Sequence, residues 1–419
     1  MNRKCLFFSC LMLLLLMMIS CGKKEKDMFP EESPDLISKD KTNWESIFEI
    51  KSQSINIHTK ANANYPNSLN KNYLIDISGN QASYCHPDVE YFPNGFRGYK
   101  YWMVFTPYFG KVGIDQFAKR YENPTVVVSN DGINWEEPKG IKNPIQDCPS
   151  VKESFREMKK EPIQGFWSDV DWMYNNGQFE LYYRGSCITP MALLKRGAKS
   201  ANNRSKLKSS AQRTIVRQTS NDGINWSPIE TVIMSNPPYT PTNSHLISPT
   251  FLQVNNEYIS YEVELNSGKK NYKSKDASFV IRRTSQNGLD FTNFRESKIV
   301  RFINKPWLEY SELNSPWHIQ ATYVNGYYFL LMAVGNVKKY TSEQLYLGYS
   351  TDGFNFYVQP KPLIEENAYR SALFLISKNE NDITFGSILG FKSGEFKYAE
   401  LKLKKRSLEL NLNTSQQVD

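Results

Sequence analysis

Three of the four histidines in this chain share one kind of local context. His86, His245 and His318 each stand just before a run of alternating apolar and aromatic residues, in the phrases CHPDVEYF, SHLISPTF and SPWHIQATY. A histidine in such a place can bind a metal ion through a ring nitrogen or hydrogen-bond a polar ligand. The similar contexts mark a candidate binding site, and a tri-histidine metal centre is one arrangement that they allow.

Carboxylate side chains accompany these strand openings and the strands beside them. They are Asp88, Asp169, Asp171, Glu262 and Glu264. Hydrolytic chemistry commonly pairs a protonated carboxyl group with an ionised one, and strand alternation places the two glutamates on one face. The alternatives are a turn-capping role for Asp88, which follows a proline, and a solvated strand face for the glutamate pair.

A seven-residue phrase occurs four times and indicates the elements that position these residues. Its copies are SNDGINW (129–135), SNDGINW (220–226), SQNGLDF (285–291) and STDGFNF (350–356). Asp-Gly and Asn-Gly favour two-residue type I′ turns, in which both central residues take positive φ. Each copy follows an alternating strand, so we expect a β-hairpin at every copy.

Upstream of each phrase lies a second shared pattern, an apolar strand, a polar turn and an aromatic strand. It begins near residues 88, 169, 249 and 319, and a fifth, degenerate copy covers 371–391. The repeats predict an all-β, five-bladed β-propeller of four-stranded antiparallel blades, closed by pairing of N- and C-terminal strands. We expect residues 72–77 to provide the strand that closes the fifth blade.

These hairpins and strand openings resemble the five-bladed β-propeller glycosidases, the superfamily that includes glycoside hydrolase family 43. The resemblance covers residues 70–405 and implies a ligand on the propeller axis, where the innermost strands begin. It also implies a first-blade base, a second-blade aspartate that tunes the acid, and a third-blade glutamate as the acid. Those roles correspond to Asp88, to Asp169 or Asp171, and to Glu262 or Glu264.

Two further glutamates are alternative acids under the same resemblance. Glu122 lies in the phrase YENP, and Glu312 lies before the fourth blade.

The resemblance also implies which residues bind substrate. His86, His245, His318, Trp167 and Arg370 all stand at strand openings. Propeller axes commonly use histidine to hydrogen-bond sugar hydroxyls, so we expect no metal centre among them, although some relatives carry an axial calcium ion. Aromatic side chains such as Trp167 stack on sugars in some proteins and pack between blades in others.

The function that follows is hydrolysis of an extracellular polysaccharide or oligosaccharide by paired carboxylates. The alternative is a glycan-binding propeller without catalytic activity that serves carbohydrate uptake. A sialidase would need three arginines that converge on one carboxylate. The sequence does not show such convergence among Arg97, Arg184, Arg217, Arg283 and Arg370.

The N-terminus has the pattern of a bacterial export signal. Arg3 and Lys4 precede an apolar run over residues 6–19, which is shorter than the roughly 20 residues of a membrane-spanning helix. The following Ser20-Cys21 resembles the lipobox, in which the cysteine is acylated. We expect Cys21 to carry a lipid; a plain cleaved signal is the alternative.

These features predict the domain organisation and the location. Residues 1–20 form the lipoprotein signal peptide, 21–41 a flexible tether, 42–405 the propeller and 406–419 a polar tail. We expect a monomer anchored by lipid to the cell membrane or the outer membrane, facing the periplasm or the exterior.

Charge and cysteine content constrain the partners. The formal net charge is +8, and the basic segment 195–213 is either a solvated loop or a lip that attracts an anionic glycan. Nucleic acid is not an expected partner of a lipid-anchored exported protein.

Cys85, Cys148 and Cys187 allow one disulfide and a free thiol, and their spacing selects no pair.

Overall fold

The computed structural model describes residues 42–58, 83–108, 122–146, 166–187, 212–235, 245–265, 277–291, 298–336, 339 and 341–407. All of them belong to one compact unit, Asp40–Asp419. Among these residues no helix has the length and apolarity needed to cross a membrane. The predicted signal peptide, Cys21, the tether to residue 41, residues 195–211 of the basic segment and the tail beyond residue 407 lie outside the described residues.

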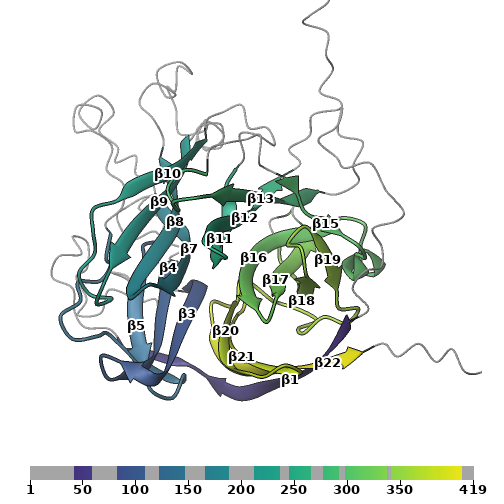
Figure 1. Cartoon of the computed structure of the whole chain (residues 1–419), viewed down its shortest axis with the longest axis horizontal. Helices are drawn as coiled ribbons and strands as arrows, with labels where there is room; N and C mark the ends of the chain where they lie inside the picture. Colours follow the sequence, from purple (N-terminus) through teal and green to yellow (C-terminus); the bar gives the residue numbers. More distant parts are fainter. Residues whose placement is uncertain are drawn as a thin grey trace, which may run out of the picture. The chain divides into compact units, whose positions relative to one another are not determined.

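Five antiparallel β-sheets form the blades of a propeller, which confirms the predicted fold (Figure 1). Blade one contains β3 (Ser83–Phe96), β4 (Tyr99–Tyr108), β5 (Thr125–Ser129) and β6 (Asn134–Glu136). Blade two contains β7 (Phe166–Asn175), β8 (Gln178–Cys187), β9 (Gln212–Ser220) and β10 (Glu230–Ser235). Blade three contains β11 (Ile247–Val254), β12 (Glu257–Leu265), β13 (Ser278–Ser285) and β14 (Lys298–Ile299).

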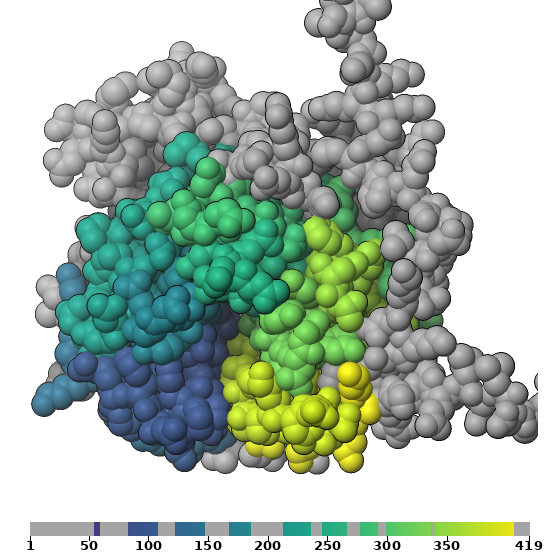
Figure 2. All heavy atoms as spheres, viewed as in Figure 1, coloured from purple at the N-terminus to yellow at the C-terminus, as the bar shows by residue number. Residues whose placement is uncertain are grey.

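The last two blades complete the ring. Blade four contains β16 (Asn314–Val324), β17 (Tyr327–Asn336), β18 (Gln344–Ser350) and β19 (Asn355–Val358), preceded by the 3₁₀ helix η5 (Pro306–Glu309). Blade five contains β20 (Ala372–Lys378), β21 (Asp382–Gly390) and β22 (Phe396–Ser407). The innermost strands β3, β7, β11, β16 and β20 contact one another in sequence, and β20 contacts β3. Figure 2 shows a narrow hollow where the blades meet.

The N-terminal strand β1 (Thr42–Ser54) pairs with β22 and forms the outer edge of blade five. Closure by the two ends of the chain is therefore confirmed, but the predicted closing strand was wrong. We assigned it to residues 72–77, which lie outside the described residues, whereas the earlier segment 42–54 occupies the place. Pairing along nearly the whole length of β22 satisfies an edge that would otherwise be open.

Two blades have a fifth, very short strand where four were expected. In blade one β2 (Asn56–His58) runs parallel to β6, and in blade four β15 (Arg301–Phe302) runs parallel to β19. Both segments belong to connections between blades. They cover the outer edges of their sheets, which removes exposed edges from those blades.

The repeated phrase forms a hairpin in blades one to four, as predicted, but not through a type I′ turn. In the first copy only Gly132 has positive φ, at 74°. The turn is held instead by Asp131, whose Oδ1 accepts hydrogen bonds from the backbone N–H groups of Ile133 and Asn134. These side-chain hydrogen bonds hold the turn without a second residue of positive φ. Paired left-handed residues occur in the inner hairpins, for example at Asn176 and Gly177.

The glycines of these turns also join neighbouring blades. A Cβ atom at Gly223 of blade two would overlap the ring of Trp102 in blade one. At Gly353 of blade four it would lie 2.8 Å from the Tyr261 hydroxyl of blade three. Each turn therefore packs its glycine against an aromatic residue of the preceding blade, which explains why the phrase requires glycine.

Candidate functional site

Irregular pairing at the start of the innermost strands directs side chains toward the axis. The register of β3 shifts between Cys85 and Asp88, and that of β7 shifts between Ser168 and Asp171. The two bulges place His86 and Asp169 in the left-handed region, with φ of 53° and 52°. Bulges commonly re-aim a side chain next to a functional site.

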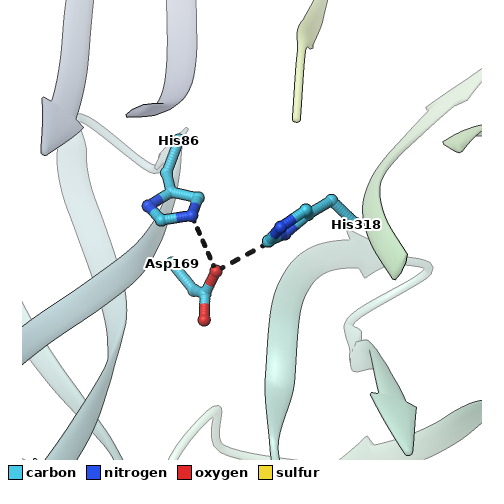
Figure 3. A group of neighbouring side chains, drawn as sticks. All are labelled: His86, Asp169 and His318. Atoms are coloured by element: carbon cyan, nitrogen blue, oxygen red, sulfur yellow. Dashed lines mark ion pairs between the residues drawn. The ribbon is translucent and has the colours of Figure 1, made fainter. Parts of the chain in front are cut away.

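His86, Asp169 and His318 converge from blades one, two and four and form what we call the axial trio (Figure 3). Asp169 Oδ1 lies 3.2 Å from His86 Nε2 and 3.7 Å from His318 Nδ1. One potential ligand atom from each side chain lies within 4.8 Å of the others, and all three residues are buried. Within the described residues this is the one group of that kind.

The hydrogen bonds of His86 determine which ring nitrogen faces the trio. Thr106 Oγ1 lies 3.3 Å from the carbonyl oxygen of Cys85, to which it donates its only proton. With that proton engaged, Thr106 Oγ1 can accept from His86 Nδ1–H, 2.9 Å away. In this tautomer the lone pair of His86 Nε2 faces Asp169. Such an orienting partner is typical of metal-binding histidines.

Burial and charge determine the protonation states within the trio. Burial lowers the pKa of His86 to about 4, although Asp169 partly offsets this effect. Burial likewise lowers the pKa of His318 well below its ordinary value. Burial alone would raise the pKa of Asp169, but His86 and Arg184 hold it well below its usual range. At neutral pH the trio thus contains one carboxylate and two neutral imidazoles.

The donor set of the axial trio fits a divalent transition-metal ion. Asp169 Oδ1 and both ring nitrogens of His318 have no hydrogen-bond partner among the described residues, and all three atoms are buried. Ligands about 2.0 to 2.2 Å from a metal ion lie roughly 3 to 3.5 Å apart, close to the separations from Asp169. Two histidines and one carboxylate form a common set for zinc or iron. A cation would also separate the facing lone pairs of His86 and Asp169.

Two arginines border the trio. Arg184 Nη1 lies 3.3 Å from Asp169 Oδ2, and its Nε donates to the carbonyl oxygen of His245. Arg370 Nη2 donates to Asp171 Oδ1 and to the carbonyl oxygen of Pro249. Its Nε and Nη1 are buried without a hydrogen-bond partner among the described residues, and Nη1 lies 3.9 Å from Asp169 Oδ1. Arg370 therefore has donor capacity left for a polar ligand.

An aromatic ring at the start of blade five adjoins the same group. The Tyr369 ring centroid lies 4.4 Å from that of His318 and 5.8 Å from that of His86. Tyr369 is half-buried. We had not named Tyr369 or Thr106 as site residues. The position of Tyr369 directly before Arg370 at a strand opening was the signal that could have identified it.

Two of the predicted carboxylates connect blades. Asp88 Oδ2 accepts the backbone N–H of Trp172, and Oδ1 accepts that of Val89. Asp171 Oδ2 accepts the backbone N–H of Phe251. Each aspartate thus links its innermost strand to that of the next blade. Burial raises the pKa of both, for Asp88 to about 7.

The predicted third-blade acids form ion pairs outside the axial trio. Glu262 lies on β12 and makes a buried ion pair with Arg283, at 2.6 Å. Glu264 lies 2.8 Å from His245 Nδ1, so His245 does not join the other two histidines. The described residues therefore form no tri-histidine centre.

The remaining candidates are dispersed. Trp167 packs in an apolar cluster between blades one and two, 5.3 Å from the ring of Tyr183. Glu122 is buried near Cys85, where it contributes to raising the thiol pKa, after burial itself. Glu312 is exposed before β16. Cys85 is a free thiol, whereas Cys148 and the side chain of Cys187 lie outside the described residues.

Comparison with solved structures identifies a protein of the same fold. No protein-family model matches the chain. An N-acetylgalactosamine deacetylase from Flavonifractor plautii, solved with blood group B trisaccharide, has a TM-score of 0.58 at 18% identity, over 85% of this chain and 95% of that one. A GH43 β-xylosidase/α-arabinofuranosidase from a compost metagenome has a TM-score of 0.45 at 10% identity, over 76% of this chain and 90% of that one.

Sequence comparison identifies one local match. A segment of 77 residues is 39% identical to the A type blood N-acetyl-alpha-D-galactosamine deacetylase of Flavonifractor plautii. The match covers 18% of this chain and 9% of that relative's own length. The chain thus has the five-bladed propeller fold of the superfamily that its sequence resembles.

Proposed function

We propose that this protein is a carbohydrate deacetylase, which removes the acetyl group from an N-acetylated sugar of an extracellular glycan. The observation that carries the proposal is the axial trio, a buried set of two neutral imidazoles and one carboxylate in which Asp169 Oδ1 has no hydrogen-bond partner among the described residues. The local match to a galactosamine deacetylase supports the same reaction class.

The reaction is the hydrolysis of an acetamide. The oxygen of water adds to the carbonyl carbon, the C–N bond breaks, and a proton goes to the nitrogen, which gives acetate and a free amino sugar. A divalent ion held by His86, Asp169 and His318 would polarise the carbonyl oxygen and lower the pKa of water. Thr106 keeps His86 Nε2 unprotonated, and Arg184 holds the carboxylate of Asp169 in place.

Two more residues complete the proposed site. Arg370 Nε and Nη1 have no hydrogen-bond partner within the described ranges, and such donors suit the negative charge that develops on the carbonyl oxygen. The half-buried Tyr369 lies beside both histidines, where an aromatic ring can pack against a sugar.

The decisive experiment measures metal content and acetate release together. Purified protein is incubated with zinc, manganese or iron(II), dialysed, and assayed on oligosaccharides that carry N-acetylgalactosamine. We expect about one bound metal ion per chain, and for Asp169→Asn a loss of that ion and at least a 100-fold lower rate of acetate release. The control is His58→Asn, which changes the exposed fourth histidine on β2. Full acetate release by Asp169→Asn would refute the assignment.

A second candidate is the glycoside hydrolase with paired carboxylates. The observation that favours it is Asp88, whose raised pKa of about 7 leaves it protonated below neutral pH. Burial and the charge of Asp88 also raise the pKa of Asp171. Release of a reducing sugar without acetate, abolished by Asp88→Asn but not by Asp169→Asn, would select this function. Glycan binding without any product would select the binding propeller.

We also propose a lipid anchor at Cys21 for the same protein. The support is the basic, apolar and small-residue pattern of residues 1–20 that ends at this cysteine. Metabolic labelling with an alkyne fatty acid tests the anchor, because Cys21→Ser should abolish the label. The proposed substrate is a glycan outside the cell, and the proposed functional unit is a monomer.

A further inference from the structure

A polar hollow of about 540 Å³ lies on blade four, outside the axial trio. It is bordered by the residue that begins β16, the last residue of β17, the first of β18 and the segment after η5. Its lining residues among those described are Tyr310, Ser311, Asn314, Asn336, Lys339, Thr341, Glu343, Gln344 and Glu365.

Two chain segments connect this hollow to the axial trio. Asn314 begins β16, and His318 stands four residues further along the same strand, about 13 Å away at 3.3 Å per residue. Glu365 lines the hollow, and Tyr369 contacts His318 four residues later. The hollow therefore lies at the end of blade four where the innermost strand begins, the end that also carries the trio.

The side chains of the hollow present amide groups at its wall. Asn314 lines the hollow and is 7% exposed. Gln344 is 2% exposed and accepts from the Tyr346 hydroxyl at 3.4 Å, a weak hydrogen bond. Planar amides carry both donors and acceptors, and at a concave surface they match the hydroxyl groups of a sugar.

An aromatic ring stands at the rim. Tyr310 follows η5 and is 57% exposed, which makes it the most exposed of the large hydrophobic residues described. Its neighbours Leu308 and Leu313 are also exposed. A ring that packs so little against its own protein is available to stack on the apolar face of a sugar.

The charges in the hollow nearly cancel. Glu343 pairs with Lys392 at 2.7 Å, which leaves Lys339 and Glu365 as one positive and one negative side chain. No charge excess attracts an anion or a cation. The hollow thus fits an uncharged, hydroxyl-rich ligand better than a sulfated or carboxylated one.

We propose that this hollow, the blade-four subsite, binds a neutral sugar unit of the same glycan whose acetylated sugar occupies the axial trio. The predicted effect of this subsite on catalysis rests on the proposed deacetylase function. Because the subsite binds a second sugar unit, the substrate is an oligosaccharide or polysaccharide chain. A monosaccharide reaches the trio but leaves the blade-four subsite empty.

The kinetic test compares two substrates, N-acetylgalactosamine and a neutral trisaccharide that carries it at the non-reducing end. For Tyr310→Ala we expect KM for the trisaccharide to rise roughly 3- to 10-fold relative to KM for the monosaccharide. Met234→Ala changes another exposed hydrophobic residue, 46% exposed on β10, and serves as the control. Equal effects of Tyr310→Ala on both substrates would overturn the proposal.

A binding test separates failure of the subsite from failure of the deacetylase. Calorimetric titration with the same trisaccharide is repeated for the wild type, Tyr310→Ala, Asn314→Ala and Asp169→Asn. Weaker binding by the first two variants supports the subsite even if no variant releases acetate. Unchanged affinity in both Tyr310→Ala and Asn314→Ala would reject the subsite, whatever the enzymatic activity proves to be.

Discussion

His86 and Asp169 show how single residues of this chain are held for chemistry. Both are non-glycine residues in the left-handed region, a conformation that costs on the order of 1 to 3 kcal/mol and persists only where surrounding structure enforces it. The bulges of β3 and β7 provide that enforcement. The backbone thus carries strain at the two positions where side chains must leave the strand face and point to the axis.

Thr106 provides a test of this arrangement through a residue that would not touch the metal. Thr106→Val removes the acceptor of His86 Nδ1–H while keeping the shape of the side chain. We expect metal affinity to fall about 10- to 100-fold, because the imidazole loses the partner that fixes its tautomer. Competition with a chelator measures the affinity. Thr106→Ser keeps the hydroxyl and should restore it, and equal affinities for both variants would contradict the proposed role.

The glycine turns between strands stabilise the blades. Gly223→Ala should lower the free energy of unfolding by about 3 kcal/mol, from left-handed strain and from overlap with the Trp102 ring. Gly177→Ala is the matched control, since it has the same left-handed strain but open space around its Cβ. Chemical denaturation measures both. Equal losses would show that the packing of the turn against blade one contributes nothing.

Glu90 joins two innermost strands, because its Oε1 accepts the backbone N–H of Tyr174 at 2.9 Å. Burial and then the charge of Asp88 raise its pKa to about 8 from 4.5. The pKa of Glu90 is thus higher in the folded state than in the unfolded state. The contribution of Glu90 to the free energy of unfolding is therefore complete below pH 4.5 and is lost as the pH rises through 8.

Glu90→Gln should remove this pH dependence. Glutamine keeps the acceptor oxygen and cannot ionise, so the variant should match the wild type near pH 5. Near pH 9 it should be more stable by about 1 kcal/mol or more. Melting temperatures from pH 5 to 9 measure the difference. The exposed Glu380→Gln is the control, and parallel curves for Glu90→Gln and the wild type would contradict the assigned pKa.

Closure of the ring is a property of the whole molecule, since β1 and β22 come from opposite ends of the described chain. A chain that begins at residue 55 should melt at a lower temperature than one that begins at residue 40. It should also associate with increasing concentration, because the long edge of β22 is left unpaired. Scanning calorimetry and light scattering measure both effects. A shortened chain that stays monomeric with an unchanged melting temperature would refute this role of β1.

The blades could be predicted from the order of the residues, because short-range rules govern them. Alternating strands, the glycine turns and the period of the repeats depend on neighbouring residues, and they predicted five blades and the positions of the hairpins, although not the turn type. The same rules located His86, Asp169, His318 and Arg370 at strand openings. They did not identify β1 as the closing strand, because its pairing with β22 spans the entire ring.

Which of those strand openings meet on the axis depends on the folded arrangement of the blades. Asp169, Asp171 and Asp88 look alike in sequence, but the bulge in β7 turns Asp169 to the axis while the other two accept backbone N–H groups of the next blade. His245 resembles His318 in sequence, yet Glu264 binds it outside the trio. Such distinctions depend on register shifts and on contacts between distant blades, which the local pattern of residues does not encode.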